Sequence, residues 1–228
     1  MPAAFIHSNR SMAISFVPAA TTRLVAAKGR RKMNKVGIYA GSFDPIHLGH
    51  ITFALQAIEA GNLDKVYFLP ERQPTAKVGL EHFGHRVAMI NQAVKPHNQL
   101  GVIELEDKKF TVNKTMARLN KRLPNQQLVF LFGSDKVPDI TTWPNSDRLF
   151  KAADFIIGLR KGDTEQQIKV LTANWPKPPL KIISSYSPKI VSTEIRDSLR
   201  NGRSAKGLLK SVAAYVKQHW LYISVRGH

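Results

Sequence analysis

Short apolar runs rich in Val, Ile and Phe alternate with longer segments of helical periodicity from Lys35 onward, and this alternation constrains the fold more than any other feature. Runs such as 128–132 and 155–157 are apolar at nearly every position, as in strands that are buried on both faces. Because parallel strands need helical crossovers, we predict an α/β fold with a doubly wound, Rossmann-like parallel sheet. The expected strands are 35–40, 65–69, 101–105, 127–132, 153–159 and 180–184, and the expected helices between them are 48–60, 81–94, 112–122 and 164–173.

The last forty residues lose the strand pattern and become helical. A short helix is expected over 193–201, and a second over 205–221 would place Leu208, Leu209, Val212, Ala213 and Val216 on one face. These two helices predict a C-terminal helical cap. Since no repeat or linker interrupts the chain after residue 33, we predict one domain over 33–228.

Residues 1–32 form a basic arm, which holds six of the 34 Lys and Arg residues and none of the acids. Richness in Arg and Ser without acids is typical of organellar targeting peptides. The alternative, which we favour, is a disordered extension or an upstream start, because Met33 directly precedes the first predicted strand. We therefore expect a cytoplasmic protein, with organellar targeting by residues 1–32 as the alternative.

The net charge and the composition limit the classes of molecule that the protein is expected to bind. The net charge is +18, Cys is absent, and no apolar run approaches the roughly 18 residues that span a bilayer. A thiolate nucleophile, Cys-ligated zinc and a membrane partner are thus not expected. A positive field attracts nucleic acid and small polyanions such as nucleoside triphosphates alike. Because the cations after residue 33 are scattered, we do not expect a nucleic-acid partner, and the sequence is compatible with a homo-oligomer.

The segment 41–50, GSFDPIHLGH, lies between the first predicted strand and helix. Ligands of open α/β sheets bind beyond the carboxyl ends of strands, where a helix N-terminus favours phosphate. Gly41 and Ser42 would let backbone approach a phosphate, and His47 and His50 share one helical face around Gly49. A His-x-x-His pair can also bind zinc, but a catalytic zinc needs a third ligand, so we predict no metal site. A P-loop motif is absent.

This segment resembles the Gly-x-Phe-x-Pro-x-His-x-Gly-His signature of the nucleotidylyltransferase superfamily, and within it looks most like the bacterial nicotinate-nucleotide adenylyltransferases. A second stretch, 190–196 (IVSTEIR), is similar to the family's Ile-Ser-Ser-Thr-x-Ile-Arg, with Val191 replacing Ser. Its hydroxyls suit a helix N-cap and its Arg a phosphate clamp. The resemblance implies that His47, His50 and Arg196 are catalytic. It implies ATP binding by Gly41, Ser42, Phe43, His47, Gly49, His50, Ser192, Thr193 and Arg196.

The acceptor side of the resemblance is less complete. The stretch 132–135 (FGSD) followed by Trp143 is similar to the family's acceptor segment, in which an aromatic plane can stack on a pyridine ring. The alternative for Trp143 is packing in the core or under the following loop, and Arg160 could equally be a surface charge. The family's Gly before Gly41 is Ala40 here, and its Pro-His-Lys element reads 74–77 (PTAK). The implied acceptor-binding residues are Lys77, Thr111, Gly133, Asp135, Trp143 and Arg160.

The resemblance implies adenylyl transfer from ATP to nicotinate mononucleotide, with Mg²⁺ bound to the polyphosphate, in NAD biosynthesis. No side-chain nucleophile is needed, because the acceptor phosphate is itself nucleophilic. Two alternatives are open. The first is adenylyl or cytidylyl transfer to another phosphorylated acceptor, such as nicotinamide mononucleotide or pantetheine phosphate. The second is a catalytically weakened, polyanion-binding member of the fold.

Overall fold

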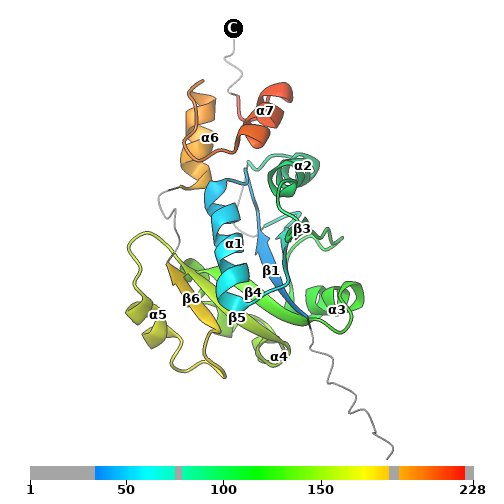
Figure 1. Ribbon diagram of the computed structural model, residues 1–228, viewed down its shortest axis with the longest axis vertical. Coiled ribbons are helices and arrows are strands. Elements are labelled where there is room, and N and C mark those ends of the chain that lie inside the picture. The colour runs from blue at the N-terminus through cyan, green and yellow to red at the C-terminus, as the bar shows by residue number, and fades with distance from the viewer. Residues whose placement is uncertain (1–33, 75–78, 185–189, 224–228) are drawn as a thin grey trace, which may run out of the picture. The chain divides into compact units, whose positions relative to one another are not determined.

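The computed structural model describes residues 34–74, 79–184 and 190–223, and the strands of these residues form one six-stranded parallel sheet (Figure 1). The order is β3-β2-β1-β4-β5-β6, and every neighbouring pair is parallel. The strands are β1 (Lys35–Gly41), β2 (Lys65–Pro70), β3 (Leu100–Val102), β4 (Gln127–Gly133), β5 (Ala153–Leu159) and β6 (Lys181–Ser184). The predicted Rossmann-like fold is confirmed.

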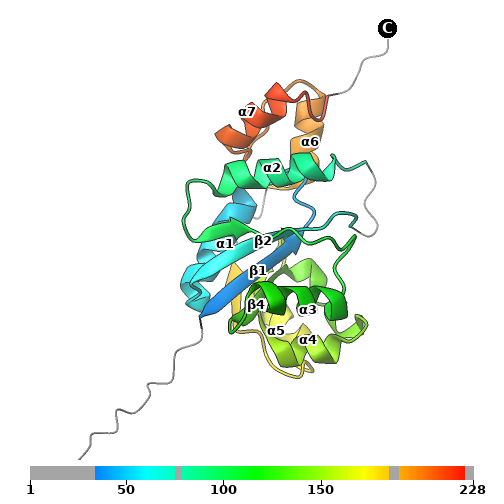
Figure 2. The same cartoon turned by 90° about the vertical axis from the view of Figure 1, so that its right-hand side faces the viewer.

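Helices cover both faces of this sheet, because successive strand residues point to opposite sides. Val129 and Leu131 of β4 pack toward α1 (Leu48–Gly61), α2 (Phe83–Val94) and α7 (Lys210–Gln218). Phe130 and Phe132 pack toward α3 (Val112–Arg122), α4 (Ser146–Ala152) and α5 (Glu165–Leu171). Figure 2 shows α3, α4 and α5 together, on the side of the sheet away from α2 and α7.

Three elements differ from the prediction. Helix α4 was not expected, since Pro138 and Pro144 interrupt the apolar period of 134–152; two short 3₁₀ helices, η1 (Ser134–Lys136) and η2 (Ile140–Thr142), precede it. Strand β3 stops at Val102. Helix α7 is shorter than 205–221, because Gly207 has a φ of 82° and Trp220 a φ of 53°. These left-handed residues confine the helix, so the predicted helical placement of Leu208 and Leu209 is wrong.

The strand order places a switch point between β1 and β4. Helix α1 leaves β1 toward one face of the sheet, whereas α4 leaves β4 toward the other. Crevices that bind ligands in open α/β sheets lie at such points, beyond the carboxyl ends of the strands. Gly41 ends β1, Gly133 ends β4 and Arg160 directly follows β5, so the fold brings three predicted site segments to one edge.

No helix within the described ranges is long and apolar enough to cross a membrane. The basic arm 1–32 and the predicted acceptor residue Lys77 lie outside the described residues.

Candidate active site

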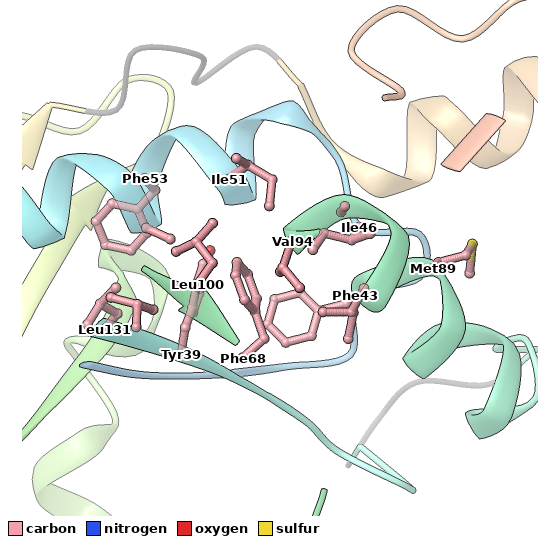
Figure 3. Packing of buried hydrophobic residues seen from close by; sticks show 14 of the residues in the cluster. Tyr39, Phe43, Ile46, Ile51, Phe53, Phe68, Met89, Val94, Leu100 and Leu131 are labelled. Atoms are coloured by element: carbon pink, nitrogen blue, oxygen red, sulfur yellow. The ribbon is translucent and has the colours of Figure 1, made fainter. Parts of the chain in front are cut away.

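The loop between β1 and α1 is built around the buried side chain of Phe43. This residue has a φ of 49°, and its ring contacts Tyr39 and Phe68 at centroid distances of 5.3 and 5.2 Å (Figure 3). A β-carbon at Gly41 would lie 3.1 Å from the Phe43 ring. Gly41 thus lets the Phe43 ring pack closely under the loop.

The two histidines of the loop form a stacked pair. Their ring centroids lie 3.7 Å apart with an interplanar angle of 26°, and the His47 backbone N–H donates to His50 Nδ1 at 3.3 Å. A neutral imidazole whose Nδ1 accepts a hydrogen bond carries its proton on Nε2. The hydrogen bond from the loop backbone therefore selects the tautomer in which His50 can donate through Nε2.

His47 is the N-cap residue of α1 and is only 4% exposed. Burial, together with the nearby charge of Arg160, lowers the pKa of His47 to about 4. The imidazole is thus neutral at pH 7, and a bound polyphosphate would favour its protonation.

The start of α1 offers fewer free donors than expected. The backbone N–H of Leu48, the first helical residue, donates to the carbonyl of Gly207 at 2.9 Å. Gly207 lies in the C-terminal region, so a tertiary contact satisfies a donor that the sequence alone leaves open to phosphate.

The second motif docks against the first through side chains at the start of α6 (Ser192–Arg200). Ser192 donates its hydroxyl to the carbonyl of Pro45 at 3.1 Å, and Arg196 Nη1 donates to the carbonyl of Asp44 at 2.7 Å. Arg196 Nη2 also donates to the Thr193 hydroxyl at 3.2 Å. The predicted N-cap role of these hydroxyls is wrong, because Val191 is the N-cap and the hydroxyls bond to the loop and to Arg196.

A third group of polar residues follows β4 and β5. Arg160 Nε donates to Asp135 Oδ1 at 2.9 Å, and the Arg160 backbone N–H donates to the Ser134 hydroxyl at 2.8 Å. Burial alone would lower the pKa of Arg160, but the charge of Asp135 and the hydrogen bond to it raise this pKa. A β-carbon at Gly133 would collide with the Asp135 carboxylate and lie 2.7 Å from Arg160 Nε. Gly133 thus makes room for the Arg160–Asp135 ion pair.

A cleft joins the first and third groups. Its lining includes His47, Gly49, His50, Gly133 and Arg160. The structure therefore brings these five predicted site residues together across the carboxyl ends of β1, β4 and β5.

Trp143 belongs to an aromatic group on the α3 side of the sheet, separate from the residues that line the cleft. Thr111 directly follows Phe110, a member of this group. The half-buried indole lies 5.6 Å from the Phe132 ring, edge to face, and 5.8 Å from Phe110. Thr111 precedes α3 and donates its backbone N–H to the Thr115 hydroxyl at 3.0 Å. Trp143 therefore packs partly against the core and keeps some exposed surface.

Sequence reasoning missed three buried residues that lie in, or hydrogen-bond to, the loop between β1 and α1. Asp44 and Arg86 are each 1% exposed, and Tyr222 is buried as well. Asp44 lies inside the first motif, but nothing in its neighbourhood along the chain indicates its partners. The only signal for Arg86 is a cation among the apolar residues of a predicted helix. The only signal for Tyr222 is a hydroxyl among apolar residues near the C-terminus.

In the part of the chain that the structure describes, no group of three His, Asp or Glu residues is placed to hold a metal ion. The cleft combines a His50 donor, a neutral His47 and two guanidinium groups nearby, which together suit a polyanion. Such a set can align phosphates and neutralise charge.

The neutral state of His47 makes stability depend on pH. Its pKa of about 4 lies below the ordinary value of 6.5, so between these pH values the unfolded chain binds a proton that the folded chain does not. The free energy of unfolding therefore falls as the pH is lowered from 6.5 to about 4, by at most about 3 kcal/mol. We expect His47→Gln to remove this part of the fall, measured by urea unfolding at pH 7.0 and 4.5.

The exposed His219 provides the control for this measurement. His219→Gln should show the same loss of unfolding free energy on acidification as the wild type. An unchanged loss in His47→Gln would assign the titration to another group.

Comparisons with known proteins extend these observations. A model of the cytidylyltransferase-like family matches residues 38–198, a range that contains both motifs. A Thermus thermophilus protein named "Probable nicotinate-nucleotide adenylyltransferase" is 32% identical over 195 residues, which cover 82% of this chain and 99% of that protein. A Lactiplantibacillus plantarum protein of the same name is 35% identical over 199 residues, covering 82% and 88%. The solved nicotinic acid mononucleotide adenylyltransferase of Plasmodium falciparum, complexed with NaAD, has a similar fold, with a TM-score of 0.69 at 23% identity over 83% of this chain and 97% of that one.

Proposed function

Because this chain belongs to the cytidylyltransferase-like family, and its curated relatives carry the name nicotinate-nucleotide adenylyltransferase over nearly their full length, we propose that it catalyses adenylyl transfer from ATP to nicotinate mononucleotide in NAD biosynthesis. The observation that carries this proposal is the cleft at the switch point, where His47, His50 and Arg160 meet and where Arg196 is held against the neighbouring loop.

The protein has to align the two substrates, and the reaction needs no covalent intermediate with a side chain. An oxygen of the acceptor 5′-phosphate attacks the α-phosphorus of ATP, and the bond from that phosphorus to the bridging oxygen breaks in line. Pyrophosphate leaves with the electron pair, and the products are the deamido dinucleotide and pyrophosphate. His50 Nε2 and the Arg196 guanidinium stabilise charge on the phosphates in this transfer, as preorganised donors do. Gly41, Ser42, Gly49, Ser192 and Thr193 shape the ATP side.

We assign the acceptor to Arg160 in the cleft lining and to the separate group that contains Trp143 and Thr111. Arg160 is already paired with Asp135, so an acceptor phosphate would share this guanidinium with the carboxylate. Trp143 offers the exposed part of its indole to a pyridine ring, and Thr111 and Lys77 complete the acceptor set. We assign the preference for nicotinate to this group.

Mg²⁺ enters as part of the ATP substrate. It would be held by the substrate phosphates and by water. When bound, it shields the polyphosphate charge.

Pyrophosphate release tests the proposal. We expect residues 33–228 and the full chain to release pyrophosphate from ATP and Mg²⁺ with equal kcat/KM when nicotinate mononucleotide is supplied. The two values should be equal because we assign the whole catalytic domain to residues 33–228 and no part of catalysis to the arm 1–32.

Nicotinamide mononucleotide and pantetheine phosphate serve as control acceptors. Release with one of these and not with nicotinate mononucleotide would reject our assignment of Trp143 while keeping the phosphate chemistry. Folded protein that is silent with all three acceptors would reject adenylyl transfer.

A further inference from the structure

A buried carboxylate belongs to the loop between β1 and α1, which also carries the predicted ATP-binding residues Ser42 and His47. Asp44 is 1% exposed, and its Oδ1 accepts the Tyr222 hydroxyl at 2.6 Å and the Glu81 backbone N–H at 3.3 Å. Its Oδ2 lies 3.9 Å from Arg196 Nη1, which instead donates to the backbone carbonyl of Asp44 at 2.7 Å. The carboxylate thus attracts Arg196 without binding it directly.

Tyr222 reaches this carboxylate from the far end of the chain. It follows α7, has a φ of 60° and is buried, and its backbone N–H donates to Glu81 Oε1 at 3.1 Å. A left-handed conformation is unfavourable for a residue with a side chain, so these hydrogen bonds and the buried ring must hold it in place. Burial, followed by the charge of Asp44, raises the pKa of Tyr222, so the hydroxyl stays a donor at neutral pH.

We propose that Tyr222 is a positioning residue for ATP binding, acting through Asp44 on the phosphate clamp Arg196. The inference rests on the proposed function of Arg196, and it adds the C-terminal turn to the determinants of ATP affinity.

The physical reason is competition for a buried charge. With the Tyr222 hydroxyl in place, Asp44 Oδ1 has two donors, and Arg196 hydrogen-bonds the Asp44 carbonyl and the Thr193 hydroxyl instead of the carboxylate. Without the hydroxyl, Oδ1 keeps only the Glu81 N–H at 3.3 Å, which leaves a buried carboxylate poorly satisfied. The Asp44 carboxylate then draws Arg196 across the 3.9 Å gap into a direct ion pair, and the guanidinium is less available to phosphate.

The test compares two hydroxyl deletions in the C-terminal region. Tyr222→Phe removes the donor to Asp44. Tyr215→Phe, on α7, removes a hydroxyl that hydrogen-bonds His85 Nδ1 at 3.0 Å, outside the cleft. The readout is calorimetric binding of an ATP analogue with a methylene bridge between its α- and β-phosphates, with Mg²⁺, in the full chain. We expect Tyr222→Phe to weaken binding about tenfold and Tyr215→Phe to leave it unchanged.

Kinetics separate positioning from general damage. In Tyr222→Phe the KM for ATP should rise, while the KM for nicotinate mononucleotide stays at the wild-type value. In an Asp44→Asn background, which lacks the charge that draws Arg196, Tyr222→Phe should have little further effect, as expected for coupled sites. Equal affinities of the Tyr222→Phe and Tyr215→Phe proteins, or an undiminished effect in the Asp44→Asn background, would overturn the proposal.

The same binding assay keeps this inference apart from the proposed function. A wild type that binds the analogue but releases no pyrophosphate would overturn adenylyl transfer alone, and the two Phe variants would still judge the role of Tyr222. A wild type that does not bind the analogue would overturn both.

Discussion

Replacing His50 by Ala is expected to lower kcat by about 10²- to 10³-fold, the loss typical of removing one preorganised donor to a developing charge. The Nδ1 atom of His50 accepts the His47 backbone N–H at 3.3 Å, so a neutral imidazole carries its proton on Nε2, and we expect Nε2 to donate to the polyphosphate. The ring is held in place by stacking on His47 at 3.7 Å and by an edge contact with Phe43 at 5.1 Å. Since these contacts exist before substrate binds, the donor needs no reorganisation during the reaction. Initial rates of pyrophosphate release measure the effect.

Two amide substitutions distinguish the donor from the structural part of this effect. In His50→Asn the amide can reach the position of Nδ1 and keep the bond to the His47 N–H, but the Nε2 donor is lost. In His50→Gln the amide reaches the position of Nε2. We expect His50→Asn to be as slow as His50→Ala, and His50→Gln to recover part of the rate. A folded His50→Asn protein with near wild-type turnover would remove His50 from the transfer step.

The four central strands, β2, β1, β4 and β5, could be predicted from the sequence because each is a nearly continuous apolar run between polar turns. Runs such as 128–132 have no amphipathic period, and burial between two layers of helices is the arrangement that accommodates them. Helix α4 was missed because it has only seven residues, and two prolines precede it. Its existence depends on the tertiary burial of Leu149 and Phe150, not on a local pattern.

The phosphate motifs could be placed because they are local: His47 and His50 are three residues apart, and both belong to one loop and helix start. What the sequence could not provide is the contact between distant segments. The Ser192 hydroxyl looks like a helix cap by its position, yet it bonds to Pro45, and the Leu48 N–H is taken by Gly207. Local rules predict that these groups serve the helix ends, whereas in the folded chain each of them hydrogen-bonds a distant segment.

Arg86 has the largest expected effect on stability. Its guanidinium is 1% exposed and donates to backbone carbonyls of three segments: to Ser42 at 2.7 Å, to Glu71 and Arg72 at 2.9 and 3.0 Å, and, through Nε, to Glu81 at 3.1 Å. Burial lowers the pKa of Arg86, while the charges of Asp44, Tyr222 and Glu71 oppose this. One cation thus joins the loop between β1 and α1, the end of β2 and the approach to α2.

Arg86→Met is therefore expected to lower the free energy of unfolding by about 3 to 5 kcal/mol, because it fills the space but leaves four carbonyls without their donor. Arg86→Lys keeps the charge, but a single ammonium cannot span these acceptors, so its loss should be intermediate. Arg72→Met is the matched control: Arg72 Nε makes one hydrogen bond, to the Leu105 carbonyl at 3.0 Å, and its guanidinium lies 4.1 Å from the Phe83 ring centroid. We expect that variant to lose only about 1 kcal/mol. Urea unfolding at pH 7 measures all three variants. Equal losses for Arg86→Met and Arg72→Met would mean that the Arg86 guanidinium does not hold the loop between β1 and α1. The position of this loop would then depend on its apolar packing around Phe43.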